Sequence, residues 1–211
     1  MQKIQKRESM INESPALCRF ELCYLFLDER ISMQIQYDNQ FLTRSFKKLY
    51  NKIKWEIKPV TVFGKTYPQP RLTAWYSYDT KPYSYSNLEL KPIAVTKELH
   101  EIFQIIEQEI KIKFNSVLLN LYRDGQDSNG WHADNEKELG KNPIIASITL
   151  GEVRPFHFKH ISIKEEKHKI KLEHGSLLLM HGEMQHYWVH HIPKTKKEIK
   201  PRINLTFRNI K

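Results

Sequence analysis

The sequence predicts an α+β domain whose core is a double-sheet jelly roll (a double-stranded β-helix), with N-terminal helices packed on one sheet. Two segments in the first half of the 211-residue chain have apolar residues at helical spacing. From residue 117 onward, short β-type segments separated by glycine-containing turns dominate. The chain shows no internal repeat or linker, so we expect a partly ordered extension over residues 1–30 and one domain over residues 31–211.

The two helices are predicted from capping residues and apolar stripes. Asp38 or Asn39 can cap a helix over residues 40–54, and Thr96 can cap a second one that extends to residue 112. The apolar residues at helical spacing are Phe41, Leu42, Phe46, Leu49, Tyr50 and Ile53 in the first helix, and Leu99, Ile102, Phe103, Ile106 and Ile110 in the second. Both stripes are expected to face the core.

The β segments are predicted from alternation and from turn residues. Residues 20–27 have β character without an evident function, and residues 33–37 can form the first strand of the domain. Residues 55–62 and 71–78 give two further strands. The remaining expected strands cover residues 117–122, 144–150, 155–163, 168–173, 176–181, 186–191 and 202–209.

Composition limits the class of protein. The net charge of +10, from 34 basic and 24 acidic residues, favours a polyanionic partner, with nucleic acid first. A Lys-rich proteome is the alternative explanation, and clustering of the charge on one face would decide between them.

Cys18 and Cys23 make neither a disulfide framework nor a zinc cluster, so we expect a reducing compartment. Because no signal peptide or membrane-length apolar run is visible, we expect a soluble intracellular monomer without membrane contact.

The stretch from Asn120 to Glu136 contains His132-Ala133-Asp134. On an extended segment, residues two apart point to the same side, so this pair can provide an imidazole and a carboxylate to one metal ion. A second His from a distant strand would complete a 2-His-1-carboxylate triad, which suits non-heme Fe(II). The candidates for that second His are residues 157, 160, 174, 181, 186, 190 and 191, and the strand pattern alone does not choose among them.

The C-terminal segment of residues 202–208 alternates strictly between apolar and polar residues. Arg202, Asn204, Thr206 and Arg208 share one face of the expected strand. Because Arg binds carboxylates through a planar two-toothed fork, two Arg on one face suggest a receptor for a dicarboxylate. The alternative is an edge strand with a solvated polar face.

Two loops carry residues that suit nucleic acid. Phe63-Gly64-Lys65 is expected at a hairpin tip, where Phe63 can insert between bases and Lys65 can contact phosphate. Tyr83 and Tyr85 lie on an expected irregular segment, where either could stack on a flipped base. In both cases ordinary loop packing is the alternative.

These motifs together resemble the AlkB family of Fe(II)/2-oxoglutarate-dependent nucleic-acid dealkylases, and its DNA-repair branch most. The similar stretches are SVLLNLYRDGQDSNGWHADNEKEL, IIASITLGEVRPFHFKH, HGSLLLM, YWVHHIP and PRINLTFR, with weaker agreement over VFGKTYPQPR and YSYSNLELKP. The order of His-x-Asp, distal His and Arg-x-Asn-x-Thr-x-Arg is specific to this family.

The resemblance implies roles for individual residues. His132, Asp134 and His190 would be the iron ligands. The residues implied at 2-oxoglutarate are Asn120, Tyr122, Arg202, Asn204, Thr206 and Arg208. The residues implied at the nucleic acid are Phe63, Gly64, Lys65, Arg71, Tyr83, Tyr85, Trp131, Asn135 and Glu136. At Asn135 the chain departs from the family, which places an acidic residue there, and Glu136 is the candidate substitute.

The function implied by the resemblance is oxidative demethylation of N-alkylated bases such as 1-methyladenine and 3-methylcytosine in DNA or RNA. The reaction would use Fe(II), O₂ and 2-oxoglutarate, and would release formaldehyde, succinate and CO₂. The expected location is the cytoplasm or nucleoid of a bacterium, or the nucleus of a eukaryote. The alternatives are a 2-oxoglutarate-dependent hydroxylase of a protein or small molecule, and a basic nucleic-acid-binding module with an inactive metal site.

Overall fold

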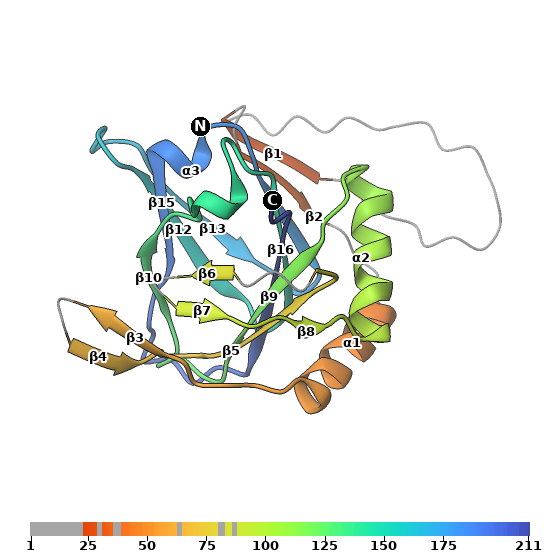
Figure 1. Cartoon of the computed structure of the whole chain (residues 1–211). Coiled ribbons are helices and arrows are strands. Elements are labelled where there is room, and N and C mark those ends of the chain that lie inside the picture. The colour runs from red at the N-terminus through yellow and green to blue at the C-terminus, as the bar shows by residue number, and fades with distance from the viewer. Residues whose placement is uncertain (1–22, 29–30, 36–38, 63–64, 80–82, 86–87) are drawn as a thin grey trace.

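A computed structural model describes residues 23–28, 31–35, 39–62, 65–79, 83–85 and 88–211. Two largely antiparallel sheets face each other, and two helices cover the outer side of the larger sheet (Figure 1). This arrangement confirms the predicted α+β class with a double-stranded β-helix core. No described helix is long and apolar enough to cross a membrane.

The larger sheet has eight strands and contains the strand that carries both candidate arginines. In spatial order its strands are β1 (Cys23–Asp28), β2 (Ile31–Ile35), β14 (Ser176–Met180), β11 (Ile145–Gly151), β16 (Arg202–Arg208), β9 (Ser116–Tyr122), β5 (Leu72–Ser77) and β8 (Ile93–Ala94). The central strand β16 pairs antiparallel with β11 on one side and β9 on the other. It is buried along its whole length, so it is not the solvated edge strand considered as an alternative.

The smaller sheet has four strands and carries the candidate metal ligands. In spatial order these are β10 (Asn129–His132), β15 (Trp188–Ile192), β12 (Arg154–His160) and β13 (Lys167–Leu172). Two separate hairpins are formed by β3 (Pro59–Val62) with β4 (Lys65–Pro68), and by β6 (Tyr83–Tyr85) with β7 (Leu88–Leu90). Figure 1 shows the hairpin β3–β4 projecting from the body on the side where β10 lies.

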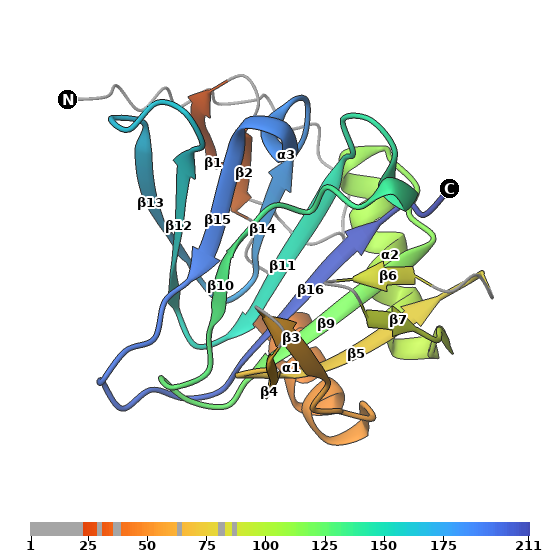
Figure 2. The ribbon, with the colours of Figure 1, turned by 60° about the vertical axis from the view of Figure 1, so that its left-hand side comes forward.

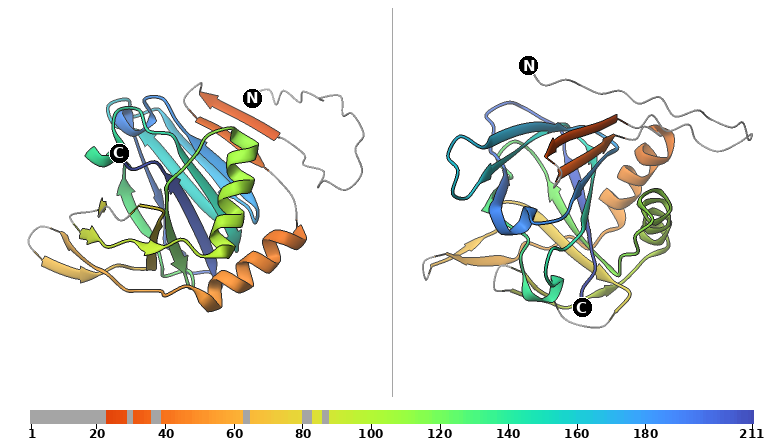
Figure 3. Two further views of the ribbon diagram at one scale, coloured as in Figure 1. Left: turned by 45° about the vertical axis from the view of Figure 1, so that its right-hand side comes forward. Right: turned by 90° about the horizontal axis from the view of Figure 1, so that it is seen from above.

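Helices α1 (Asn39–Lys52) and α2 (Lys97–Ile110) lie beside each other on one face of the larger sheet (Figure 3). The Thr96 side chain accepts a hydrogen bond from the Leu99 backbone N–H at 3.3 Å, which satisfies one of the free donors at the start of α2. A short helix, α3 (Met184–Tyr187), precedes β15, and a 3₁₀ turn covers Lys137–Leu139. The cap and both predicted helices are confirmed.

Two apolar clusters form the core, one on each side of the larger sheet. One cluster joins the helices to the sheet, with Leu99, Phe103 and Phe207 among its members. The other lies between the two sheets and includes Phe158 and Trp188. The candidate site lies beside this second cluster, so the two sheets that enclose the site are held together by apolar packing.

The predicted elements differ from the structure in several places. The strands expected over residues 55–62 and 155–163, for example, are observed as Pro59–Val62 and Arg154–His160. Residues 23–27, which were expected to have β character without an evident role, lie in β1, and the pairing of β1 with β2 joins this segment to the larger sheet. The predicted strand over residues 186–191 begins at Trp188, because residues 184–187 turn into α3. The segment expected to be irregular around Tyr83 and Tyr85 is a strand, because β7 pairs with it.

Candidate metal and co-substrate site

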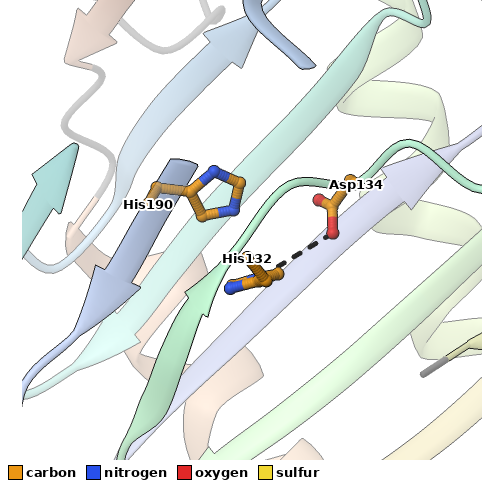
Figure 4. Close-up of side chains that lie close together, drawn as sticks. All are labelled: His132, Asp134 and His190. Atoms are coloured by element: carbon orange, nitrogen blue, oxygen red, sulfur yellow. Dashed lines mark ion pairs between the residues drawn. The ribbon is translucent and has the colours of Figure 1, made fainter. Parts of the chain in front are cut away.

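His132, Asp134 and His190 converge from two adjacent strands (Figure 4). His132 ends β10, Asp134 follows it, and His190 is the cross-strand partner of His132 on β15. The possible ligand atoms of the three side chains all lie within 4.8 Å of one another, and the His132 Nε2 to Asp134 Oδ1 distance is 3.7 Å. The antiparallel register between β10 and β15 therefore chooses His190 among the seven candidate histidines.

The protonation states of the triad suit a divalent metal. Burial lowers the pKa of His190 to about 3, and burial also lowers the pKa of His132. Burial alone would raise the pKa of the Asp134 carboxyl, but the Arg208 guanidinium and the two imidazoles outweigh it and hold this pKa below its usual range. At neutral pH the triad thus consists of two neutral imidazoles and one carboxylate, which are the forms that bind metal.

Hydrogen bonds at both ring nitrogens orient the His132 ring and set its tautomer. His132 Nδ1 lies 2.8 Å from the Gly130 carbonyl oxygen, and because a carbonyl can only accept, the proton is on Nδ1. The lone pair is then on Nε2, which accepts from the Asn129 side-chain amide at 3.1 Å. A backbone carbonyl that holds the other nitrogen of a histidine is a common support for a metal ligand.

Asp134 is held by two buried side chains. Arg208 Nη2 lies 3.0 Å from Asp134 Oδ1, and both residues are almost fully buried. The Asp134 backbone N–H donates to Gln185 Oε1 at 2.9 Å, and the Gln185 amide in turn contacts Met180 Sδ at 3.7 Å. Gln185 is 1% exposed and lies on α3, so the short helix before β15 fixes the backbone of the carboxylate ligand.

Arg202 is a buried cation without an acidic partner among the described residues. Its Nη2 donates to Thr149 Oγ1 at 2.8 Å, and its guanidinium lies 5.2 Å from the centre of the Tyr122 ring. Its Nε and Nη1 are buried and have no hydrogen-bond partner in the described part of the chain. Burial lowers the pKa of Arg202 to about 10, so the group stays charged at neutral pH. A buried positive charge without an acidic partner favours the binding of an anion beside it.

The other predicted co-substrate residues line the same pocket as Arg202 and the triad. Asn120, Tyr122, Asn204 and Thr206 all contribute to it, together with Arg208. Asn204 Nδ2 donates to Ser147 Oγ at 2.7 Å and to the Ile148 carbonyl at 3.2 Å. Thr206 Oγ1 donates to Asn204 Oδ1 at 3.1 Å. Thr206, Asn204 and Ser147 therefore form a connected hydrogen-bond chain inside the pocket.

Arg71 contacts a residue that lines the pocket. Its Nε donates to Asn120 Oδ1 at 2.8 Å, and its Nη1 reaches the Ser128 carbonyl at 3.4 Å. The residue is buried, so in this structure it supports Asn120.

Of the remaining predicted substrate residues, those whose side chains the structure describes do not line this pocket. Trp131 is 44% exposed and stacks on His191, with ring centres 3.9 Å apart. Asn135 and Lys65 are exposed, and Glu136 is half-buried. Tyr83 and Tyr85 are on β6, and Phe63 and Gly64 lie outside the described residues.

Sequence reasoning missed several residues that shape the site. Gln185, Asn129, Thr149 and Ser147 each hydrogen-bond to a residue of the candidate site. Ser147 and Thr149 alternate on β11, which could have marked them as one face of a strand. Gln185 gave no signal, because its role depends on the packing of α3 against the loop after β10.

The residues present fit both Fe(II) and 2-oxoglutarate. Two neutral imidazoles and a carboxylate on one side of a pocket are the ligand set of non-heme Fe(II) sites that keep open positions. Nδ1 of His190 is buried without a hydrogen-bond partner in the described residues, so the ring is not engaged in the protein's own network at that atom. Arg202 supplies the charge for a carboxylate at the other end of the pocket.

Comparison with known proteins places the chain in a class. The family model of the 2OG-Fe(II) oxygenase superfamily matches residues 34–208. Alpha-ketoglutarate-dependent dioxygenase alkB homolog 3 of Bos taurus is 38% identical over 177 residues, which cover 78% of this chain and 60% of the relative. DNA oxidative demethylase ALKBH2 of Mus musculus is 34% identical over 175 residues, covering 78% of this chain and 73% of the relative.

The chain therefore belongs to the 2OG-Fe(II) oxygenase superfamily and, within it, to the AlkB family. It spans about 60% of the length of the alkB homolog 3 relatives. A solved structure titled "The structure of OsALKBH1" matches with a TM-score of 0.60 at 17% identity, covering 88% of this chain and 99% of that chain. That likeness supports the fold alone.

Proposed function

We propose that this protein is an Fe(II)- and 2-oxoglutarate-dependent dioxygenase that demethylates N-alkylated bases in nucleic acid. The observation that carries the proposal is the single pocket that contains both the triad and the unpaired cation Arg202. A metal triad alone would suit many reactions, whereas a buried guanidinium opposite it selects a co-substrate with a carboxylate. The name of the ALKBH2 relative, DNA oxidative demethylase, supports nucleic acid as the substrate class.

His132, Asp134 and His190 would hold the iron, and Arg202 would bind the distal carboxylate of 2-oxoglutarate. With O₂, the bound iron and 2-oxoglutarate supply the oxidising chemistry that converts the N-methyl group to a hydroxymethyl group. The hydroxymethyl group then leaves the nitrogen as formaldehyde, and 2-oxoglutarate becomes succinate and CO₂. Arg208 keeps Asp134 ionised through its 3.0 Å contact, so the carboxylate ligand stays available.

The finer substrate in this proposal is 1-methyladenine or 3-methylcytosine in DNA or RNA. Both lesions block normal base pairing, so extruding such a base from a duplex costs less than flipping an intact pair. The hairpin β3–β4 carries exposed Lys65 and Tyr67 and projects on the side of β10 (Figure 1), which supports a contact between this hairpin and the nucleic acid.

The test is formaldehyde release from methylated oligonucleotides, single- and double-stranded, of DNA and of RNA. We expect release that requires Fe(II), O₂ and 2-oxoglutarate together, and that is lost in Asp134→Ala. If iron-loaded protein converts 2-oxoglutarate to succinate but leaves every methylated oligonucleotide intact, the substrate class is wrong, and a hydroxylase of a protein or small molecule becomes the better account.

A further inference from the structure

The smaller sheet has a basic outer face. On β12 and β13 the outward-facing cross-strand pairs are Pro155 with Lys171, His157 with Lys169, and Lys159 with Lys167. Their inward-facing neighbours, such as Phe156, Phe158 and Ile170, are buried against the larger sheet. Figure 2 shows the four strands at the front of the molecule, with no described helix over them.

Strands β15 and β10 continue this face. His191 is the cross-strand partner of His157, and its ring stacks on Trp131 of β10. Trp131 and His191 are the chain neighbours of the metal ligands His132 and His190, so the same two strands present ligands inward and these aromatic side chains outward. We call the outward side chains of β10, β12, β13 and β15 the outer face. Every strand of the outer face is described, and none contributes an Asp or Glu to it.

The arrangement of charge on the outer face is unfavourable for the sheet by itself. Lys159 and Lys167 are directly opposite each other, and like charges at such positions destabilise a strand pair. Lys159 is partly compensated, because its Nζ lies 4.4 Å from the centre of the Trp131 ring. Lys167, Lys169 and Lys171 are exposed, and no ion pair of theirs is found among the described residues. A bound anion would relieve this repulsion.

The dimensions of the outer face suit a chain of phosphates. Alternate residues on a strand are about 6.7 Å apart, so Lys167, Lys169 and Lys171 form a regular row of cations. Four strands at about 4.8 Å spacing make the face about 14 Å wide, from the β13 row to Trp131. β10 is an edge strand and carries the metal ligand His132, so the outer face begins at the edge of the catalytic pocket.

We propose that the outer face binds the phosphodiester backbone of the nucleic-acid strand that carries the target base, on one flank of that base. The Lys167–Lys169–Lys171 row contacts successive phosphates, and the Trp131 edge of the face borders the pocket that takes the base. This inference rests on the proposed function, because it presupposes a nucleic-acid substrate. It adds a second contact region, outside the pocket, that makes affinity depend on the length of the strand.

The experiment compares two variants with equal loss of charge. The first changes Lys167, Lys169 and Lys171 to Gln. The second changes Lys47, Lys48 and Lys54 to Gln, which are exposed residues on or next to α1, on the opposite side of the larger sheet. For both variants and the unchanged protein, binding of long and short unmodified single strands is measured against salt concentration, and formaldehyde release is measured from long and short methylated strands.

For the outer-face variant we expect at least a tenfold weaker affinity for the long strand, and a log–log salt slope that is smaller by about 2, since each lost phosphate contact removes about 0.7 from the slope on a single strand. The short strand should be bound and demethylated within about twofold of the unchanged protein. The α1 variant should match the unchanged protein throughout.

Equal losses of affinity for the long strand in both variants would overturn the proposal, because net charge alone would then explain binding. Unchanged affinity in both variants would overturn it as well. Because the binding measurement uses unmodified strands, it separates this inference from the proposed function. Binding that depends on the outer face without any formaldehyde release would retain the docking surface and remove the assigned reaction.

Discussion

The Asp134 ligand illustrates how single residues prepare the site for metal. Its carboxylate is held by Arg208, and its backbone N–H is held by Gln185, so both the charge and the position of the ligand are set without metal. His132 is fixed in a similar way through the Gly130 carbonyl. A site prepared in this manner binds its metal without first ordering the ligands.

Gln185→Met tests the role of the α3 amide. The substitution keeps the size of the side chain but removes the acceptor for the Asp134 N–H, and loss of such a supporting hydrogen bond typically weakens metal affinity about 10- to 100-fold. We expect a loss in this range in a titration of the protein with Fe(II) under anaerobic conditions. Tyr187→Phe, an exposed change on the same helix, is the control. Unchanged Fe(II) affinity in Gln185→Met would show that the contact does not support the ligand.

Arg202→Met should weaken 2-oxoglutarate binding without lowering the stability of the ligand-free protein. Loss of a buried charge that pairs with a ligand costs about 2–5 kcal/mol of binding free energy, so the 2-oxoglutarate affinity should fall at least 30-fold. Without ligand, replacing a buried unpaired charge by an apolar side chain leaves the free energy of unfolding unchanged or raises it. Calorimetric binding and denaturant unfolding measure the two effects. A strong loss of stability in the ligand-free variant would contradict the picture of an unpaired guanidinium.

At the scale of elements, the sequence predicted which helices and strands form better than it predicted the residues at which they begin and end. The α2 helix was predictable, because Thr96 caps it and its apolar stripe is regular. The turn of residues 184–187 into α3 was not, because that segment has no capping side chain, and its place depends on packing of Met184 and Gln185. β1 had apolar β character but no turn signal that joined it to the domain, and only its pairing with β2 places it.

The two ends of α2 give a matched pair of stability changes. Thr96→Ala removes a side-chain cap and should lower the free energy of unfolding by about 1 kcal/mol. Lys111 has a positive φ of 58°, where a side chain is strained, so Lys111→Gly should stabilise the protein by a few tenths up to about 1 kcal/mol. Urea unfolding measures both. If Lys111→Gly destabilises the protein, the left-handed C-cap is not strained.

At the scale of the whole molecule, some site residues could be predicted from the sequence and others could not. His132 and Asp134, and the polar face of β16, follow from alternation along one strand, which is a local property. The partner His190 does not, because the choice among seven histidines depends on the register between β10 and β15. Trp131 was expected at the substrate, and its placement on the outer face follows from the same alternation that turns His132 inward.

The stability of the metal-free protein should depend on pH through the buried histidines. The pKa of His190 is near 3 in the folded protein and about 6.5 when the chain is unfolded, so between these values the unfolded chain binds more protons. The stabilisation is therefore complete above about pH 6.5 and is lost as pH falls, by up to about 1.4 kcal/mol per pH unit for this one group. The depressed pKa of Asp134 keeps that carboxylate ionised throughout this window.

Denaturant unfolding of the metal-free protein between about pH 4 and pH 7 checks this dependence. His190→Gln cannot titrate, so its unfolding free energy should fall less steeply as the pH is lowered. The same pH slope in the variant and the unchanged protein would show that His190 is not buried in its neutral form.

The central claim is that one pocket holds Fe(II) on His132, Asp134 and His190 while Arg202 seats 2-oxoglutarate beside it. The most direct measurement is the charge-transfer absorption of the anaerobic protein with Fe(II) and 2-oxoglutarate. We predict a visible band that needs both additions, disappears in His132→Ala, and requires much more 2-oxoglutarate in Arg202→Met. A band that persists in His132→Ala, or 2-oxoglutarate binding that is the same with and without Arg202, would contradict the account.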